Sequence, residues 1–289
     1  MLTSEQLQQF ENDGYVVIKG FLSEDEVTSL ESARARIVDE MNPNEHQISV
    51  FSTVEDRQIS LRAKDDYFLQ SGDKVRFFWE EGAIDEKGQL TVDRSLGINK
   101  IGHALHWLVP EFRRVTFSER VRACFRALGF AAPVVAQSMY IFKQPGIGGE
   151  VTPHQDATFL YTEPEKIVGL WIALEDADRE NGCLWFAPGS HRDPLTRRFV
   201  RNPDPSGPRL VFRGEQTQLE QAAFVPEEVR RGDCVFISGR VHHCSSANRS
   251  TRSRHIYTFH VVETQDTQYA ADNWLQPSEA LPFPPLYEQ

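Results

Sequence analysis

Residues 134–146 read VVAQSMYIFKQPG, an apolar run of strand length that ends in the turn-forming pair Pro145-Gly146. Branched and aromatic residues favour strands, whereas Pro-Gly pairs mark turns. Further apolar runs follow, separated by turn signals such as Asn181-Gly182 and Gly232-Asp233. They cover residues 167–174, 183–187, 222–225, 234–238 and 256–262. Many short strands without intervening helices predict an antiparallel jelly-roll sandwich or barrel.

The part of the chain before this core has a helical pattern. Thr3 with Gln6, and Ser23 with Glu26, have the spacing of capping boxes, so helices are expected to begin there. We also expect a strand over 15–18, a hairpin from 76–79 that turns near 85–88, and helices over 100–128 interrupted at Pro110. The prediction is a mainly β protein with one domain, 1–289, in which a helix-rich part, 1–132, flanks a cupin-like jelly-roll core, 133–289.

Composition limits the classes of partner. Of the 289 residues, 40% are hydrophobic and 25% are charged, as in an average globular protein. A net charge of −11 argues against general binding to nucleic acid or an anionic membrane, because both need a basic surface. The sequence has no apolar run of about 18 residues, so we expect no membrane span.

Several features predict a cytoplasmic location. The first residues are polar and lack the apolar segment of a signal peptide, and the last ones match no peroxisomal or ER-retention signal. The four cysteines share no CxxC spacing and are expected to be reduced thiols: Cys124, Cys183, Cys234 and Cys244. The sequence does not indicate an oligomeric state.

Two of the nine histidines are followed by an aspartate two positions later, in His154-Gln155-Asp156 and His191-Arg192-Asp193. Alternate residues of a strand point to one face, so either pair can direct an imidazole and a carboxylate at one ion. His243 is the candidate third ligand. Two histidines and one carboxylate form the facial triad of non-heme Fe(II) oxygenases, which leaves metal positions open.

Strand counting separates the two pairs. Four strand-like runs lie between Asp156 and His243, enough to pass round both sheets of a jelly roll, and His191 lies in a turn between Gly189 and Pro194. We therefore assign the metal to His154, Asp156 and His243. Strand alternation directs His242 to the opposite face, so it is not expected to bind the metal.

A nearby arginine favours an oxygenase. Oxygenases of this class use 2-oxoglutarate, which chelates the iron and whose distal carboxylate needs a permanently charged, bidentate partner. Arg254 follows His243 by eleven residues and shares a strand face with Ile256, Thr258 and His260. Ser245 is placed to add a hydroxyl donor to the same carboxylate. The arginine-rich segment 192–213 is instead expected to be a solvated loop.

Several longer strings resemble the phytanoyl-CoA dioxygenase family, and the similarity covers nearly the whole chain. They are GEVTPHQD (149–156), ENGCLWF (180–186), PGSH (188–191), SGDKVRFF (71–78), NKIGHALH (99–106), QSMYIFKQP (137–145), NWLQP (273–277) and His243-x-Ser245. The resemblance implies a double-stranded β-helix, Fe(II), and oxidation that depends on 2-oxoglutarate. It places iron on His154, Asp156 and His243. It also implies 2-oxoglutarate contacts from Lys100, Met139, Gln155, Trp171, Ser245 and Arg254.

The expected reaction couples oxidative decarboxylation of 2-oxoglutarate, which gives succinate and CO2, to hydroxylation of a small-molecule substrate by O2. One alternative is a non-catalytic jelly roll that binds a small molecule and keeps a residual metal site. A metal-dependent hydrolase with the same triad is a third possibility, but it leaves Arg254 without a task. The substrate cannot be deduced, because kinship transfers reaction type better than substrate.

Overall fold

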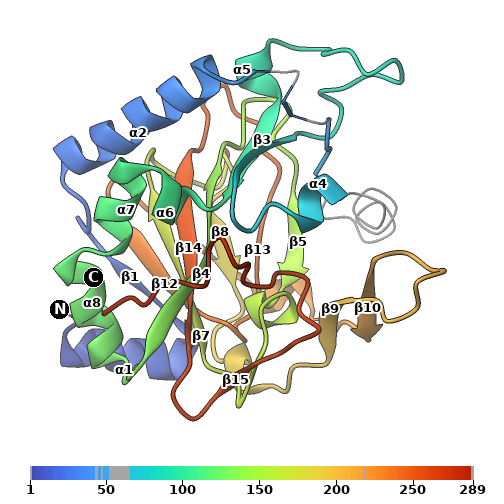
Figure 1. Cartoon of the computed structure of the whole chain (residues 1–289). Helices are drawn as coiled ribbons and strands as arrows, with labels where there is room; N and C mark the ends of the chain where they lie inside the picture. Colours follow the sequence, from blue (N-terminus) through green and yellow to red (C-terminus); the bar gives the residue numbers. More distant parts are fainter. Residues whose placement is uncertain (1, 43–44, 47, 52–65, 218, 288–289) are drawn as a thin grey trace.

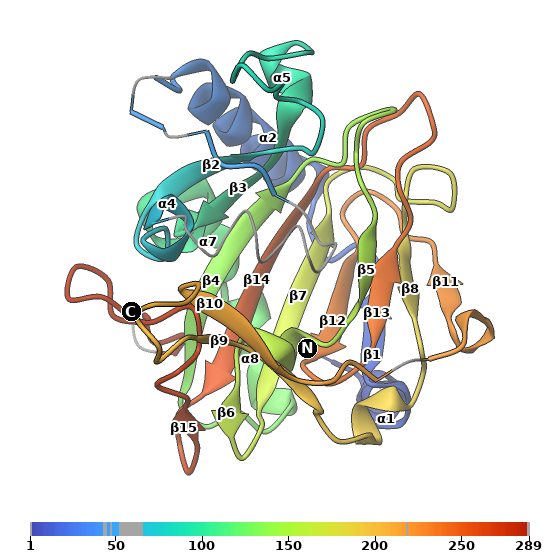
Figure 2. The same cartoon turned by 90° about the vertical axis from the view of Figure 1, so that its right-hand side faces the viewer.

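The computed structural model describes residues 2–42, 45–46, 48–51, 66–217 and 219–287. Its larger sheet has seven strands, which lie side by side in Figure 2. In spatial order these are β1 (Tyr15–Ile18), β12 (Cys234–Ser238), β7 (Ile167–Ala173), β14 (Ile256–Glu263), β4 (Pro133–Ile141), β3 (Ile98–His103) and β2 (Val75–Trp79). The ladders between them are antiparallel.

The smaller sheet has four antiparallel strands and carries part of the candidate site. Its order is β11 (Val225–Glu227), β8 (Leu184–Phe186), β13 (His243–Ser245) and β5 (Val151–His154). Outside the two sheets, β9 (Arg197–Arg201) pairs with β10 (Leu210–Gly214), and β6 (Thr162–Glu163) pairs with β15 (Gln268–Tyr269). Three short 3-10 helices are η1 (Asp156–Thr158), η2 (Ser190–Arg192) and η3 (Gln221–Ala223).

Helices cover the outer face of the large sheet (Figure 1). The longer ones are α1 (Ser4–Asp13), α2 (Glu24–Asp39), α7 (Pro110–Thr116) and α8 (Glu119–Ala127). The short helix α6 (Leu105–Leu108) also packs there. Two other short helices are α5 (Arg94–Gly97) and α4 (Asp66–Leu69), and the Tyr67 and Phe68 side chains of α4 pack in a separate apolar cluster. None of the described helices is long and apolar enough to cross a membrane.

Alternation along the strands of the large sheet separates two cores. On β7, Leu170 and Ile172 pack against the helices, while Trp171 and Ala173 pack against the four-stranded sheet. The two sheets thus enclose their own buried layer, and the chain has the jelly-roll fold that the strand pattern predicted. On β14 the same alternation sends Tyr257 and Phe259 to the helices and leaves Ile256 between the sheets.

Several local predictions are confirmed. Both capping boxes form, with Thr3 and Ser23 accepting from the backbone of Gln6 and Glu26. Helix α1 ends at Gly14, whose φ of 81° is a left-handed conformation that glycine adopts without strain. Strand β1 lies at the predicted position, and Pro110 begins α7 at the position where a missing N–H costs least.

Other local predictions are wrong. The segment 192–213 is not a solvated loop: it contains β9 and most of β10, because Phe199 and Leu210 bury apolar side chains that the arginines masked. The turn predicted at 85–88 does form, since the N–H of Gly88 donates to the carbonyl oxygen of Asp85 and Ile84 bridges Leu90. The strand that pairs with β2 is, however, β3, most of which lies within the region predicted to be helical. The first half of the run 222–225 lies in η3, and the strand β11 begins only at Val225.

Candidate metal centre and adjoining cavity

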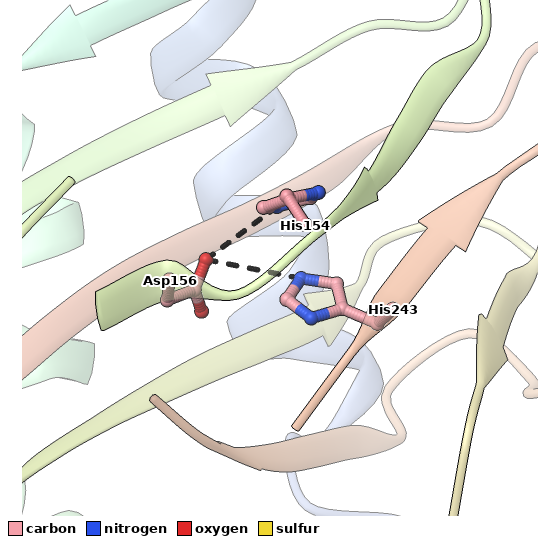
Figure 3. A group of neighbouring side chains, drawn as sticks. All are labelled: His154, Asp156 and His243. Atoms are coloured by element: carbon pink, nitrogen blue, oxygen red, sulfur yellow. Dashed lines mark ion pairs between the residues drawn. The ribbon is translucent and has the colours of Figure 1, made fainter. Parts of the chain in front are cut away.

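Three side chains converge at one end of the four-stranded sheet. His243 on β13 lies directly opposite His154 on β5, and Asp156 begins η1 two residues after the last residue of β5. Figure 3 shows both rings directed at one oxygen of the carboxylate. Asp156 Oδ1 is 3.6 Å from His154 Nε2 and 3.8 Å from His243 Nε2. One ligand atom from each residue lies within 4.8 Å of the others, so the three can hold one metal ion.

Backbone contacts prepare both imidazoles as ligands. His154 Nδ1 is 2.9 Å from the Thr152 carbonyl oxygen, and His243 Nδ1 is 3.1 Å from that of Val241. A carbonyl only accepts hydrogen bonds, so each Nδ1 carries the proton and donates it. The Nε2 lone pairs are therefore left facing Asp156, as a metal-binding histidine requires.

The charges around the triad also suit a cation. Burial alone would raise the pKa of Asp156, but the neighbouring imidazoles, His260 first among them, hold that pKa well below its usual range. Burial, with His154 close by, lowers the pKa of His243 to about 4. At neutral pH the site thus holds one carboxylate and a neutral His243, which are the forms that bind a metal.

The three side chains do not meet through the strand geometry that the sequence predicted. Strand β5 stops at His154, so Asp156 shares no strand face with it; the turn into η1 brings the carboxylate back beneath the ring. His242 also precedes its strand, and its buried ring lines the same cavity as His154 rather than the opposite face. His191 lies in η2, where it contacts the carbonyl oxygen of Glu11.

Arg254 is buried without its full set of partners. It is 2% exposed, and Cζ lies 5.2 Å from the centre of the Trp171 ring. Among the described residues, Nε and Nη1 have no hydrogen-bond partner, and neither has the buried Oγ of Ser245. Burial lowers the pKa of Arg254 to about 10, so the group is still a cation at pH 7. Buried donors without partners are costly, which indicates that a ligand completes this region.

Three of the other predicted contacts line the cavity described below, whereas Trp171, Ser245 and Arg254 are not among its lining residues. Lys100 Nζ is 3.7 Å from Met139 Sδ, and both residues line the cavity described below. Gln155 lines it as well and donates through Nε2 to the carbonyl oxygen of Arg240 at 2.6 Å. Thr258 of β14 pairs with both Met139 and Trp171, so these residues lie on adjacent strands of one sheet.

A cavity of about 500 Å³ opens beside His154 and Asp156. Its apolar lining includes Phe68, Phe159, Leu160, Phe212 and Trp274. Polar residues also line it, among them Gln137, Arg197, Gln216 and His242. The volume and mixed lining are typical of a small-molecule site.

Sequence reasoning missed several residues of this site. Arg197 stacks on Phe212, with Cζ 3.8 Å from the ring centre, in the hairpin that was predicted to be a loop. Lys143 is a further buried basic residue, whose Nζ donates to the carbonyl oxygens of Gly149 and Ser246 at 2.7 Å. Alternation from Arg254 identified His260 as an inward residue of β14, but it gave no sign that His260 contacts Asp156.

The cysteines take no part in this arrangement. All four are free, and Cys124, Cys183 and Cys234 are buried. Burial raises the pKa of Cys183 and of Cys244 to about 11, so these thiols are protonated at neutral pH.

Comparison with solved structures agrees with the jelly-roll fold. The α-ketoglutarate-dependent carbocyclase SnoK from nogalamycin biosynthesis superposes with a TM-score of 0.61 at 21% identity, covering 97% of this chain and 96% of its own. EvdO2 from Micromonospora carbonacea var. aurantiaca, complexed with 2-oxoglutarate, gives a TM-score of 0.60 at 18% identity, covering 96% and 98%.

Sequence relatives are closer. "Phytanoyl-CoA dioxygenase domain-containing protein 1" of Bos taurus is 53% identical, and its counterpart in Danio rerio is 50% identical, each over 99% of both chains. A "Phytanoyl-CoA dioxygenase" of Arabidopsis thaliana is 45% identical over 95% of this chain and 94% of its own. The family model described as phytanoyl-CoA dioxygenase matches residues 10–256. The chain therefore belongs to the phytanoyl-CoA dioxygenase family.

Proposed function

We propose that this protein is an Fe(II)- and 2-oxoglutarate-dependent dioxygenase that hydroxylates a small organic substrate. The proposal is supported above all by one combination: a triad arranged for a metal, and a buried arginine whose donors lack partners in the described structure. A jelly roll that only binds a small molecule has no need for both. In this reaction one atom of O2 enters succinate and the other enters the hydroxylated product. The CO2 is the carboxyl group that 2-oxoglutarate loses.

The donor set fits Fe(II). Two neutral imidazole nitrogens and one carboxylate on one side of an ion are typical of non-heme Fe(II) oxygenases and leave positions for a cosubstrate and O2. His154, Asp156 and His243 would hold the ion. When bound, the iron supplies the activation of O2, and the protein supplies the geometry around it.

The cosubstrate would be held mainly by Arg254. A guanidinium presents two parallel N–H donors to a carboxylate, and the partnerless Ser245 hydroxyl adds a third. We propose that Lys100, Met139, Gln155 and Trp171 form the remaining walls, in accordance with the resemblance. Trp171 covers one face of the guanidinium, which keeps it dry and strengthens its attraction to an anion.

The substrate would occupy the cavity beside His154 and Asp156. Phe159, Phe212 and Trp274 offer an apolar surface, while His242 provides buried ring nitrogens without partners in the described chain. We therefore propose a small, largely apolar molecule with an oxygen-bearing group that His242 orients. Burying the substrate between these side chains also excludes water from the reacting position.

Succinate release tests this function directly. Purified protein loaded with Fe(II) should convert 2-oxoglutarate to succinate slowly without substrate, and faster when a fraction of a metabolite extract contains the substrate. Asp156→Ala and Arg254→Ala should each remove the activity, while the exposed Arg179→Ala should not. Failure of the wild type to release succinate under any condition would favour the non-catalytic alternative.

We also propose a cytoplasmic location for this protein. Four free thiols suit a reducing environment, and we predict the cytoplasm on that ground and from the sequence.

A further inference from the structure

The two oxygens of the Asp156 carboxylate have different neighbours. Oδ1 faces His154 and His243, at 3.6 and 3.8 Å from their Nε2 atoms. Oδ2 lies 3.2 Å from Nε2 of His260, a buried residue of β14 on the opposite sheet. The carboxylate therefore has neighbours on both sheets. Its Oδ1 contacts the two histidines of the triad, whereas its Oδ2 contacts a residue outside the triad.

Gln137 contacts the other ring nitrogen of His260. It lies opposite His260 in the β4–β14 ladder, and its Nε2 is 3.4 Å from His260 Nδ1. An amide nitrogen only donates, so Nδ1 accepts and the ring hydrogen is on Nε2. This tautomer donates a hydrogen bond to Asp156 Oδ2. Both side chains are buried, which limits the access of water to these contacts.

Gly169 provides the space for this contact. It faces His260 in the β7–β14 ladder. A Cβ at position 169 would lie 3.1 Å from Asp156 Oδ2 and 3.3 Å from His260 Nε2, closer than ordinary van der Waals contact. Any side chain here would press between the two groups. A residue without a side chain is needed so that His260 can reach the carboxylate.

We infer that Gly169, His260 and Gln137 act together to hold Asp156 as a one-oxygen metal ligand. The inference rests on the proposed metal site and deepens it. A carboxylate free to rotate could bind the ion through both oxygens and occupy a position needed by cosubstrate or O2. The hydrogen bond from His260 occupies Oδ2 and leaves Oδ1 to the ion. His260 is thus a positioning residue, acting through Asp156.

The binding of Mn(II) to the full-length protein, measured by calorimetry, tests this role without turnover. Loss of a group that orients a metal ligand typically costs about 10–100-fold in affinity. His260→Leu should weaken Mn(II) binding by this factor, and His260→Gln, which keeps an N–H donor, should recover most of it. Gly169→Ala should also weaken binding, although it removes no polar group.

A matched control is His106→Leu. His106 is as buried as His260, but its Nδ1 is hydrogen-bonded to Ser138 and it belongs to α6. Its replacement should leave Mn(II) affinity unchanged while showing the general effect of losing a buried imidazole. Thermal unfolding of each variant shows whether it is folded at the temperature of the titration.

The outcomes separate this inference from the proposed function. If wild type binds no Mn(II), the metal site itself is wrong. If wild type binds Mn(II) and a folded His260→Leu binds it equally well, the positioning role is wrong. Should His260→Leu fail to fold, Gly169→Ala and Gln137→Leu decide: unchanged affinity in both overturns the inference, and weakened affinity in both supports it.

Discussion

The metal triad and the region around Arg254 are both buried, yet they are built in opposite ways. In the triad, each Nδ1 has a carbonyl partner and both carboxylate oxygens have neighbours. Around Arg254, two guanidinium nitrogens and the Ser245 hydroxyl have no partner in the described structure. The first region is organised before its ligand arrives, whereas the second depends on a ligand for its missing hydrogen bonds.

This difference has an energetic meaning. Orienting ligands in advance lowers the entropy lost when a metal binds. An unpaired buried cation, by contrast, destabilises the protein until an anion arrives. Ligand-free protein is therefore expected to be strained around Arg254 and relaxed around the triad.

The largest effect is expected from breaking the triad at Asp156. Asp156→Gly removes the carboxylate that Nε2 of both His154 and His243 face, so succinate release should be abolished. Asp156→Glu shifts the oxygen by roughly 1 Å and should cost about 100-fold in rate. Succinate assays on the two variants check this, and wild-type activity in Asp156→Gly would remove Asp156 from the site.

Alanine variants of the two neighbouring histidines test which of them binds the metal. His243→Ala should weaken Mn(II) binding by more than about 100-fold, because a ligand costs more than the groups that orient ligands. His242→Ala should leave the affinity nearly unchanged, since its ring is outside the triad. Calorimetric titration of the two variants measures both. The reverse order would mean that the ligand is His242.

Removing the buried arginine should make the ligand-free protein more stable. Arg254→Met removes a buried charge and two unpartnered donors, so the ligand-free variant should be more stable by about 1–3 kcal/mol. Arg231→Met is the control, because Arg231 pairs with Glu24 and Glu31 and its loss should not stabilise the protein. Chemical denaturation gives both values, and a marked loss of stability in Arg254→Met would contradict this interpretation.

Glu165 is a buried carboxyl group with one charged partner, and its effect on stability can be tested by varying the pH. Burial raises the pKa of Glu165 to about 7. The charge of Arg240, whose Nε lies 3.3 Å from Glu165 Oε2, acts in the other direction and limits this rise. The folded state then binds the proton more tightly than the unfolded chain, so this stabilisation is complete below about pH 4 and is lost as pH rises through 7. In Glu165→Gln, the decrease in unfolding free energy between pH 5 and 8 should be smaller by about 1–2 kcal/mol. Identical pH profiles would exclude Glu165 as its source.

The sequence predicted the fold well because strand alternation and turn residues act locally. The β7, β12 and β14 runs and both capping boxes lie where expected. It failed where charge masked apolar burial, as in the β9–β10 hairpin with Arg197 and Arg201. It also failed to identify β3 as the partner of β2, because most of β3 falls within the region predicted to be helical.

The candidate site was predictable to a similar extent. His154, Asp156 and His243 were identified as a set, although the strand geometry invoked for Asp156 does not exist. His260 and Gly169 could not be linked to Asp156, because the contact depends on how closely two strands bring their side chains together. Such distances are properties of packing, and residue order does not encode them in a readable form.

Calorimetric titration of 2-oxoglutarate into protein loaded with Mn(II) tests the central claim most directly. The wild type should bind one 2-oxoglutarate per chain. Losing the bidentate partner in Arg254→Ala should cost about 2–5 kcal/mol, at least about 30-fold in affinity, with only partial recovery in Arg254→Lys. Equal affinity in wild type and Arg254→Ala, or no binding by the metal-loaded wild type, would contradict the account.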